Sequence, residues 1–492
     1  MKEVTAAELA KHNKRDDMWI SVEGQVLNVT DFSKRHPGGA SVLRKVAGTE
    51  ATKQFLKFHP TSVLRMLEPA EVVGKLKDYK AEGAAPPADD EQSQQLERNR
   101  KAKPALSEMY NLLDFELVAR HTLERVGWYY YSSGADDEIT LRENHRAYQR
   151  IWFRPKVLVD VSNIDYSTTM LGVRTNSPFY ITATALAKLG HSEGEVVLTR
   201  AAHKKGLIQM LSTLSSCSID EVMDAAQPAQ PVWMQVYVNA DREVTRRYIQ
   251  HGEKLGVKGF FVTVDAPQLG RREKDMRSKY DADLADVQGD DEAEREQGAA
   301  RAISSFIDPA LSWKDVPFLR SCTRQPLALK GVGRWEDAVK AAECGLDAVV
   351  LSNHGGRQLE FSRSAVEVLA EVMPQLKKRG LDKKISVFVD GGIRRGTDVL
   401  KALCLGAKGV GIGRPFLYAM STYGEAGVAR AVQLLNDEIE MGMRLLGVTK
   451  IEELDESLLD TSFLRAHSAV PADHTSEGVY ERLMQPQFRS KI

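Results

Sequence analysis

Eight short apolar segments, each rich in Val, Ile, Leu or Phe, recur along the second part of this 492-residue chain, with helix-compatible stretches between them. Short uninterrupted apolar runs are typical of parallel strands buried on both faces. Eight strand–helix units over roughly 250 residues predict an α/β fold, a (β/α)8 TIM barrel. The expected strands are 178–183, 207–211, 232–238, 259–264, 326–330, 347–352, 385–389 and 408–412.

The alternative for such a pattern is an open, doubly wound sheet, but no GxGxxG motif follows the first strand. The expected helices are 192–205, 218–226, 241–255, 334–344, 364–379 and 395–405. An unusually long segment separates the fourth and fifth strands. Its part from 278 to 300 is acidic and poor in apolar residues, which predicts a mobile loop.

The remaining chain divides by composition. Residues 1–80 alternate short helical and strand-like pieces, including two expected strands around Gly24, and predict a small α+β domain. Residues 81–103 are polar and contain a Pro-Pro pair, which predicts a linker or hinge. The barrel domain, with an N-terminal segment and a C-terminal tail, then spans 104–492.

Composition excludes several classes of protein. The chain has 67 Lys and Arg and 68 Asp and Glu, a net charge of -1, so no design for binding nucleic acid is expected. Four cysteines in so long a chain exclude a disulfide scaffold. No apolar run approaches the roughly 18 residues that would suggest a membrane span. The first twenty residues lack the apolar core of a signal peptide, which favours a cytoplasmic protein unless a transit peptide has been removed.

Polar or glycine-rich residues follow the expected strands at the end where barrel enzymes place their chemistry. Gly391 and Gly392 with Arg394, and Gly413 with Arg414, suit a phosphate, because backbone N–H groups and a fixed cation bind anions. Lys330 could place positive charge against a cofactor ring that becomes anionic on reduction. The small residues Ala183 and Ala185 leave room for a flat ligand.

His354 is the best candidate for a general base, because the ordinary pKa of histidine lies near neutrality. Asp265 could orient His354 and stabilise the imidazolium that forms. Arg357 can bind a carboxylate with two parallel hydrogen bonds. These three residues predict an enzyme that removes a proton from an acidic substrate.

Two histidines mark the N-terminal domain: His36, in an HPGG sequence, and His59. Two imidazoles on opposite faces of a haem would make an electron-transfer site, although their spacing alone favours ordinary turn histidines. Residues 4–77 resemble a cytochrome b5-type haem domain, through the HPGG sequence, the second histidine and the pattern around Trp19. The resemblance implies that His36 and His59 are the axial metal ligands of haem b.

Residues 107–466 resemble the FMN-dependent α-hydroxy-acid dehydrogenases and oxidases. The strings that carry this resemblance include YYSSGADDEIT, VTVDAPQLGRREKDMR, LSNHGGRQ and VDGGIRRG. The resemblance implies that Tyr130, Arg272 and Arg357 contact the substrate carboxylate, Tyr237 its hydroxyl, and that His354 and Asp265 are catalytic. It also implies flavin contacts by Ala183, Ala185, Ser212, Gln235, Thr263, Lys330, Asp390, Arg394, Gly413 and Arg414.

The combined resemblance implies oxidation of L-lactate, or another small L-2-hydroxy acid, to a 2-oxo acid, with electrons passing from FMN to haem b and then to cytochrome c. It further implies a homotetramer in the mitochondrial intermembrane space. Two alternatives stay open: an oxidase or dehydrogenase of the same family that uses oxygen or another carrier, and a haem sensor with an inactive barrel. The intact set of Tyr130, Tyr237, Asp265, His354 and Arg357 argues against the sensor.

Overall fold

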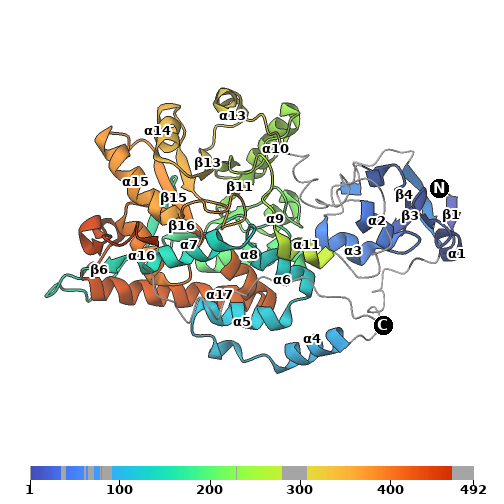
Figure 1. The fold of residues 1–492 in the computed structure, drawn as a ribbon, viewed down its shortest axis with the longest axis horizontal. Helices are drawn as coiled ribbons and strands as arrows, with labels where there is room; N and C mark the ends of the chain where they lie inside the picture. The colour runs from blue at the N-terminus through green and yellow to red at the C-terminus, as the bar shows by residue number, and fades with distance from the viewer. Residues whose placement is uncertain are drawn as a thin grey trace.

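The computed structural model describes residues 2–34, 40–59, 63–64, 71–77, 79, 91–228, 230–279 and 307–467. Figure 1 shows a small N-terminal unit beside a much larger barrel. His36 and most of the predicted loop 278–300 lie outside the described residues.

The N-terminal unit is built on a five-stranded sheet in the order β1-β5-β4-β3-β2. The expected hairpin around Gly24 is confirmed: β3 and β4 pair antiparallel, and Glu23 and Gly24 both have positive φ, as a tight hairpin turn requires. Met18, Val22 and Leu27 are buried in its own core. Its elements are β1 (Lys2–Val4), α1 (Ala6–Leu9), β2 (Asn13–Lys14), β3 (Asp17–Val22), β4 (Gln25–Asn28), η1 (Phe32–Lys34), α2 (Ala40–Val46), α3 (Thr52–Phe58) and β5 (Val72–Leu76).

The predicted linker differs from expectation in its second half, where residues Glu91–Ala102 form helix α4. This helix has no apolar stripe, which is why the sequence pattern did not reveal it. Its side chains instead donate hydrogen bonds to the end of helix α5 (Leu112–Thr122): Asn99 to the carbonyl of His121 at 2.8 Å, and Arg100 to that of Thr122 at 3.0 Å. The end of the predicted linker is therefore attached to the barrel unit.

The predicted barrel is confirmed. Eight parallel strands close into a ring because the last strand, β16, pairs with the first, β9, which excludes the open sheet. Each strand overlaps an expected apolar segment. The strands are β9 (Phe179–Ile181), β10 (Gln209–Leu211), β11 (Val232–Val236), β12 (Phe260–Thr263), β13 (Leu327–Val332), β14 (Ala348–Leu351), β15 (Ser386–Asp390) and β16 (Gly409–Ile412).

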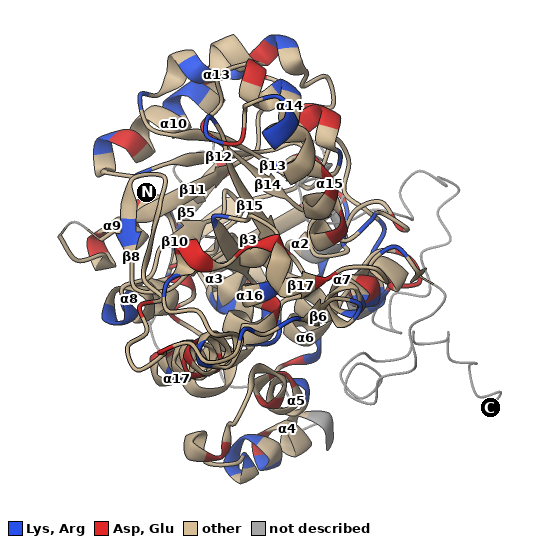
Figure 2. Cartoon of the chain, turned by 90° about the vertical axis from the view of Figure 1, so that its left-hand side faces the viewer, with Lys and Arg blue, Asp and Glu red and all other residues tan. Residues whose placement is uncertain are grey.

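Helices surround the ring of strands (Figure 2), and their basic and acidic side chains are interspersed. All six expected helices are present. The barrel helices are α8 (Glu195–Lys205), α9 (Ile219–Ala225), α10 (Arg242–Leu255), α13 (Val316–Cys322), α14 (Trp335–Glu343), α15 (Ala365–Lys378), α16 (Gly396–Cys404) and α17 (Arg414–Leu446). Further elements are η4 (Leu106–Glu108), α6 (Arg125–Ser132), α7 (Ile139–Gln149), β6 (Trp152–Phe153), β7 (Thr168–Met170), β8 (Val173–Thr175), η5 (Ala187–Leu189), α11 (Glu273–Lys279), η8 (Trp313–Asp315), η9 (Ile451–Glu453), η10 (Glu456–Leu458) and β17 (Leu459–Asp460).

The barrel interior is filled by side chains. Tyr180, Trp233, Phe261 and Phe388 are fully buried there and form a cluster of edge-to-face and tilted ring contacts. Met170, from the β7–β8 hairpin, packs so closely that a Cβ on Gly409 would collide with its sulfur. A ligand must therefore bind at an end of the barrel. None of the described helices is both long and apolar enough to cross a membrane.

Candidate active site

The structure brings the predicted barrel residues together in one cavity at the carboxyl ends of the strands. Every predicted substrate and flavin residue lines it, and Asp265 lies directly behind it. The predicted lining residues are Tyr130, Ala183, Ala185, Ser212, Gln235, Tyr237, Thr263, Arg272, Lys330, His354, Arg357, Asp390, Gly391, Gly392, Arg394, Gly413 and Arg414.

His354 and Asp265 form the pair that the sequence predicted. His354 Nδ1 lies 3.0 Å from Asp265 Oδ1, which leaves Nε2 for a substrate proton. The backbone at His354 has a φ of 59°, unusual for a residue other than glycine and common at functional sites. Gly331 is required behind the pair, because its φ is positive and a Cβ there would overlap Cγ of Asp265.

The environment favours a neutral imidazole. Burial lowers the pKa of His354 below its ordinary value, although the Asp265 carboxylate acts in the opposite direction. Burial opposes ionisation of Asp265, but His354 and Lys330 outweigh burial and lower the pKa of Asp265. A neutral histidine beside an ionised aspartate can accept a proton and stabilise the resulting charge.

A pH dependence follows from this shift. A protonated His354 cannot act as a base, so flavin reduction should decline with falling pH through the pKa of His354. Because that pKa is lowered, the midpoint of the acid limb should lie below 6.5, the ordinary value for histidine. Stopped-flow flavin reduction between pH 5 and pH 8 measures the limb. A midpoint above 6.5 would contradict the prediction, and Asp265→Asn should move the midpoint still lower.

The predicted carboxylate-binding residues lie at one side of the cavity. Arg357 Cζ lies 4.9 Å from the centroid of the Tyr130 ring. Burial, then repulsion by Arg272, lowers the pKa of Arg357 to about 10. Burial raises the pKa of Tyr237 and that of Tyr130, so both phenols keep their protons and can donate hydrogen bonds. Two cations and two phenol donors are a suitable set for a carboxylate and a hydroxyl.

Lys330 lines the cavity and is buried. Its Nζ is 3.3 Å from Asp390 Oδ2. Burial acts to lower the pKa of Lys330, but Asp390 and Asp265 outweigh it, so the net shift is upward and the ammonium is retained. Nearby, Gln235 Nε2 donates to Thr263 Oγ1 at 2.8 Å, and Ser212 Oγ donates to Gln235 Oε1. These groups offer donors and acceptors to the polar edge of a flat ring.

The two arginines predicted for a phosphate also hold protein groups in place. Arg394 Nε lies 3.1 Å from Glu116 Oε2, and both side chains are buried. Arg414 donates from its three nitrogens to the carbonyls of Tyr131, Gly355 and Ser133. Glu116 was missed by the sequence analysis because it lies on α5, 278 positions from its partner.

The cavity also contains residues that the sequence analysis did not select. Thr182 lines it with a buried Oγ1 that has no hydrogen-bond partner among the described residues, and its place at a strand end could have revealed it. The other such residues include Tyr131, Thr184, Leu269, Gly355, Ile393, Pro415 and Leu417.

The residues present fit FMN. The Thr182 hydroxyl, which has no hydrogen-bond partner among the described residues, the small side chains of Ala183 and Ala185, and the buried Lys330 suit a flat polar ring, while Arg394 and Arg414 suit a phosphate. Gly391 and Gly392 are required by the turn itself, because both have positive φ and a Cβ on Gly392 would overlap the carbonyl oxygen of Asn144.

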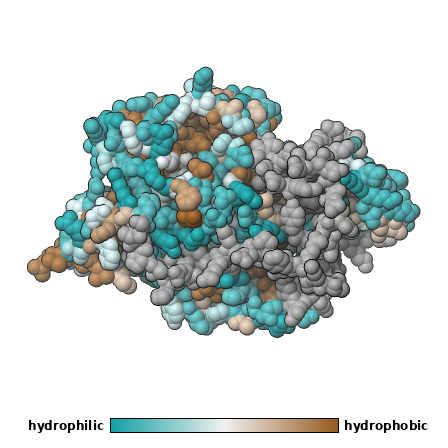
Figure 3. Space-filling view, in the orientation of Figure 1, coloured by the Kyte–Doolittle hydropathy of each residue, from teal (hydrophilic) through white to brown (hydrophobic). Residues whose placement is uncertain are grey.

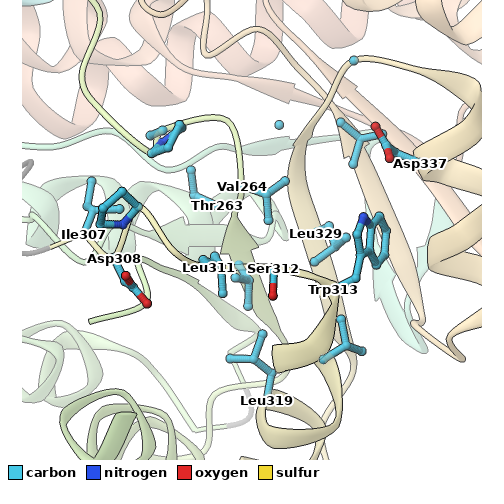
Figure 4. A pocket seen from close by; sticks show the side chains of 18 residues that line it. Thr263, Val264, Ile307, Asp308, Leu311, Ser312, Trp313, Leu319, Leu329 and Asp337 are labelled. Atoms are coloured by element: carbon cyan, nitrogen blue, oxygen red, sulfur yellow. The ribbon is translucent and has the colours of Figure 1, made fainter. Parts of the chain in front are cut away.

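A second cavity lies behind β12 and β13 and differs in its chemistry (Figure 4). Its walls are mainly apolar, with Ile307 and Asp308 on one side and Trp313 and Asp337 on the other. Among the residues that the structure describes, no lysine or arginine lines it. A cavity with carboxylates and no cation does not suit an anionic hydroxy acid, so the cation-lined cavity is the better candidate.

The haem site is described only in part. His59 directly follows α3, is partly buried, and has its ring 5.0 Å from that of Phe55. An imidazole beside an aromatic ring in an apolar core suits haem ligation, and the other expected ligand, His36, is outside the described residues. Helix α3 contacts η5 of the barrel unit.

Residues 119–461 match the family model for FMN-dependent dehydrogenases, and residues 5–77 match that for cytochrome b5-like heme/steroid binding domains. The chain therefore belongs to the FMN-dependent dehydrogenase family and carries a cytochrome b5-like domain at its N-terminus. It is 56% identical to an L-lactate dehydrogenase (cytochrome) of Wickerhamomyces anomalus, over 100% of this chain and 86% of that protein.

An L-lactate dehydrogenase (cytochrome) of Saccharomyces cerevisiae is 51% identical, over 98% of this chain and 83% of that protein. A peroxisomal (S)-2-hydroxyacid oxidase of Arabidopsis thaliana is 41% identical, over 74% of this chain and 99% of its own length. Among solved structures, a mutant flavocytochrome b2 with pyruvate bound matches with a TM-score of 0.72 and 52% identity, over 82% of this chain and 100% of that one.

Proposed function

We propose that this protein is an L-lactate dehydrogenase that oxidises L-lactate to pyruvate and passes the electrons from FMN through haem b to cytochrome c. The observation that carries the proposal is the single cavity in which a neutral His354, paired with Asp265, faces Arg272, Arg357 and Tyr237. The cytochrome b5-like domain supplies the means of transferring electrons one at a time.

The side chains perform the proton chemistry. Arg272 and Arg357 bind the lactate carboxylate, and Tyr237 holds the hydroxyl. His354 Nε2 accepts a proton from the substrate, from Cα or from the hydroxyl, while Asp265 stabilises the imidazolium. Conversion of lactate to pyruvate releases two electrons and two protons. FMN, when bound, supplies the two-electron acceptor, with Lys330 positioned to balance the charge of its reduced form.

Absorbance spectra of the purified protein test the proposal. We expect oxidised flavin and a b-type haem, both reduced on addition of L-lactate. Haem without flavin, or flavin that lactate does not reduce, would overturn the enzyme assignment. Measuring oxygen uptake beside cytochrome c reduction distinguishes the dehydrogenase from a related oxidase.

Cytochrome c is proposed as acceptor because of the haem domain and the relatives' names. Residues 1–80 carry 14 Lys and Arg and 10 Asp and Glu, a net charge of +4, so steering of a basic partner would need a local acidic surface. A reduction rate that falls as ionic strength rises would support such steering. A rate independent of salt would remove electrostatic steering from the proposal.

Leu214 is proposed to limit the size of the substrate side chain. It lines the cavity and packs against the apolar cluster of Tyr237, Ala266 and Leu269. Leu214→Ala should therefore lower kcat/KM for lactate and raise it for 2-hydroxybutyrate and mandelate, with a change of about 1–3 kcal/mol per methylene gained or lost. Steady-state assays with lactate, 2-hydroxybutyrate, mandelate and glycolate measure the four values of kcat/KM. Unchanged ratios, or a wild-type preference for mandelate, would contradict the assignment.

We further propose a homotetramer. Val157, Leu158 and Val159 are exposed, as are Met441 and Leu445 near the end of α17. The backbone N–H of Lys156 donates to the carbonyl of Leu446, which joins the two segments, and Figure 3 shows an apolar tip at this end of the molecule. Exposed apolar patches often mark protein interfaces. Sedimentation equilibrium should give four times 54.7 kDa, and a monomer would contradict the proposal.

For location we propose the mitochondrial intermembrane space, because cytochrome c is the proposed acceptor. Fractionation of cells that express the full-length gene tests it, and recovery of the protein in the cytosol would contradict it.

A further inference from the structure

Three segments around the substrate side of the cavity are tied to one another. The first carries Tyr130, the second Arg272 and the third His354 and Arg357. The amide of Asp136 donates to the carbonyl of Arg271 at 3.0 Å, and the amide of Ala135 donates to the carbonyl of Gly356 at 2.8 Å. The substrate residues are thus held on three segments whose mutual placement determines the geometry of carboxylate binding.

A buried ion pair joins two of these segments. Lys274 Nζ, in the first turn of α11, lies 3.3 Å from Glu138 Oε2, and the side chains are 3% and 2% exposed. Glu138 Oε1 also accepts a hydrogen bond from the amide of Gly134 at 2.8 Å. Neither residue lines the cavity, so neither is placed to touch the substrate.

The attraction between Lys274 and Glu138 acts against the electrostatic repulsion between Arg272 and Arg357. Arg272, two residues before Lys274, repels Arg357 strongly enough to contribute to the lowered pKa of Arg357. Before a carboxylate binds, this repulsion tends to push Arg272 away from the segments that hold Tyr130 and Arg357. Attraction between Lys274 and Glu138 draws the same two segments together in a low-dielectric setting, where charge interactions are strong.

We propose that Lys274 and Glu138 are positioning residues for substrate binding: their buried ion pair holds Arg272 at the separation from Tyr130 and Arg357 that a 2-hydroxy acid carboxylate requires. This inference rests on the proposed function. It predicts that loss of the pair weakens carboxylate binding while the proton chemistry of His354 continues.

The test uses the full-length holoenzyme with Lys274→Met, Glu138→Gln, the double variant and Lys274→Arg. Each is assayed for kcat and KM with L-lactate, for pyruvate binding by perturbation of the flavin spectrum, for FMN content and for the thermal midpoint. Glu273→Gln is the matched control, because it breaks the more exposed ion pairs of Glu273 with Arg271 and Arg277 on the same segment.

For both single variants we expect KM for lactate and Kd for pyruvate to rise at least tenfold, with kcat within threefold and FMN content unchanged. Each removes one partner of a buried ion pair, so the thermal midpoint should also fall. The double variant should recover part of the lost stability, because neither charge of the pair is then buried without the other, yet it should keep its raised KM. Lys274→Arg and Glu273→Gln should stay within threefold of the wild type in KM.

Two results would overturn the inference. One is an unchanged KM and Kd in the single and double variants. The other is recovery of KM together with stability in the double variant, because the pair would then act only on folding. Failure of the wild-type protein to bind pyruvate or to oxidise lactate would instead contradict the proposed function, so the two failures are distinguishable.

Discussion

Replacement of His354 by glutamine is expected to lower the rate of flavin reduction by L-lactate by about 10²–10⁴-fold, the usual contribution of a general base. Glutamine is close to histidine in size and polarity but cannot accept a proton at neutral pH. Anaerobic stopped-flow mixing with lactate, followed by flavin absorbance, measures the rate. FMN and haem spectra should be unchanged, because no flavin or haem ligation is assigned to this imidazole.

A matched control exists at the surface. His251 Nε2 lies 3.0 Å from Asp220 Oδ1, the same separation as in the buried pair, but His251 is about half exposed and does not line the cavity. His251→Gln should leave the rate within twofold of the wild type. A His354→Gln variant that reduces flavin within tenfold of the wild-type rate would contradict the assignment of His354 as base.

Replacement of His59 by alanine is expected to remove the b-type haem spectrum and to abolish lactate-driven cytochrome c reduction, while flavin reduction by lactate continues at the wild-type rate. If His36 and His59 hold the haem iron, as the sequence predicts, this variant would lack one of the two imidazoles. The barrel has its own core and its own cavity, so its chemistry does not depend on the haem. Absorbance spectra report the haem, and two parallel assays measure flavin reduction by lactate and lactate-driven cytochrome c reduction.

Lys53→Ala is the control for this experiment, because Lys53 is exposed on the same helix, α3. It should retain haem and cytochrome c reduction. Continued cytochrome c reduction in a His59→Ala protein that lacks haem would show that electrons leave the flavin by another route, which would contradict the proposed path.

The barrel could be predicted from sequence because each strand is an uninterrupted apolar run and each helix lies in the interval that follows. The polar residues at strand ends were predictable for the same reason, since strand direction places them at one end of the barrel. The buried ion pairs of Glu116 with Arg394 and of Glu138 with Lys274 could not be predicted, because each joins segments that are distant in sequence. The positive φ of His354 also could not be predicted from the sequence, since a histidine does not require it.

The N-terminal domain was predictable in outline from its hairpin, but His36, one of its two predicted haem ligands, lies outside the described residues. Helix α4 was missed because its stability comes from hydrogen bonds of Asn99 and Arg100 to α5 rather than from an apolar face.

Attachment of α4 to the barrel unit shortens the tether between the two redox domains. Only the residues between Leu76, at the end of β5, and Glu91, at the start of α4, are left to connect them, and a chain of that length spans at most roughly 50 Å when fully extended. A domain on so short a tether has an effective concentration in the millimolar range, on the order set by short linkers. Electron transfer to the haem domain should therefore be first order, with a rate constant independent of protein concentration, because both redox domains belong to one chain.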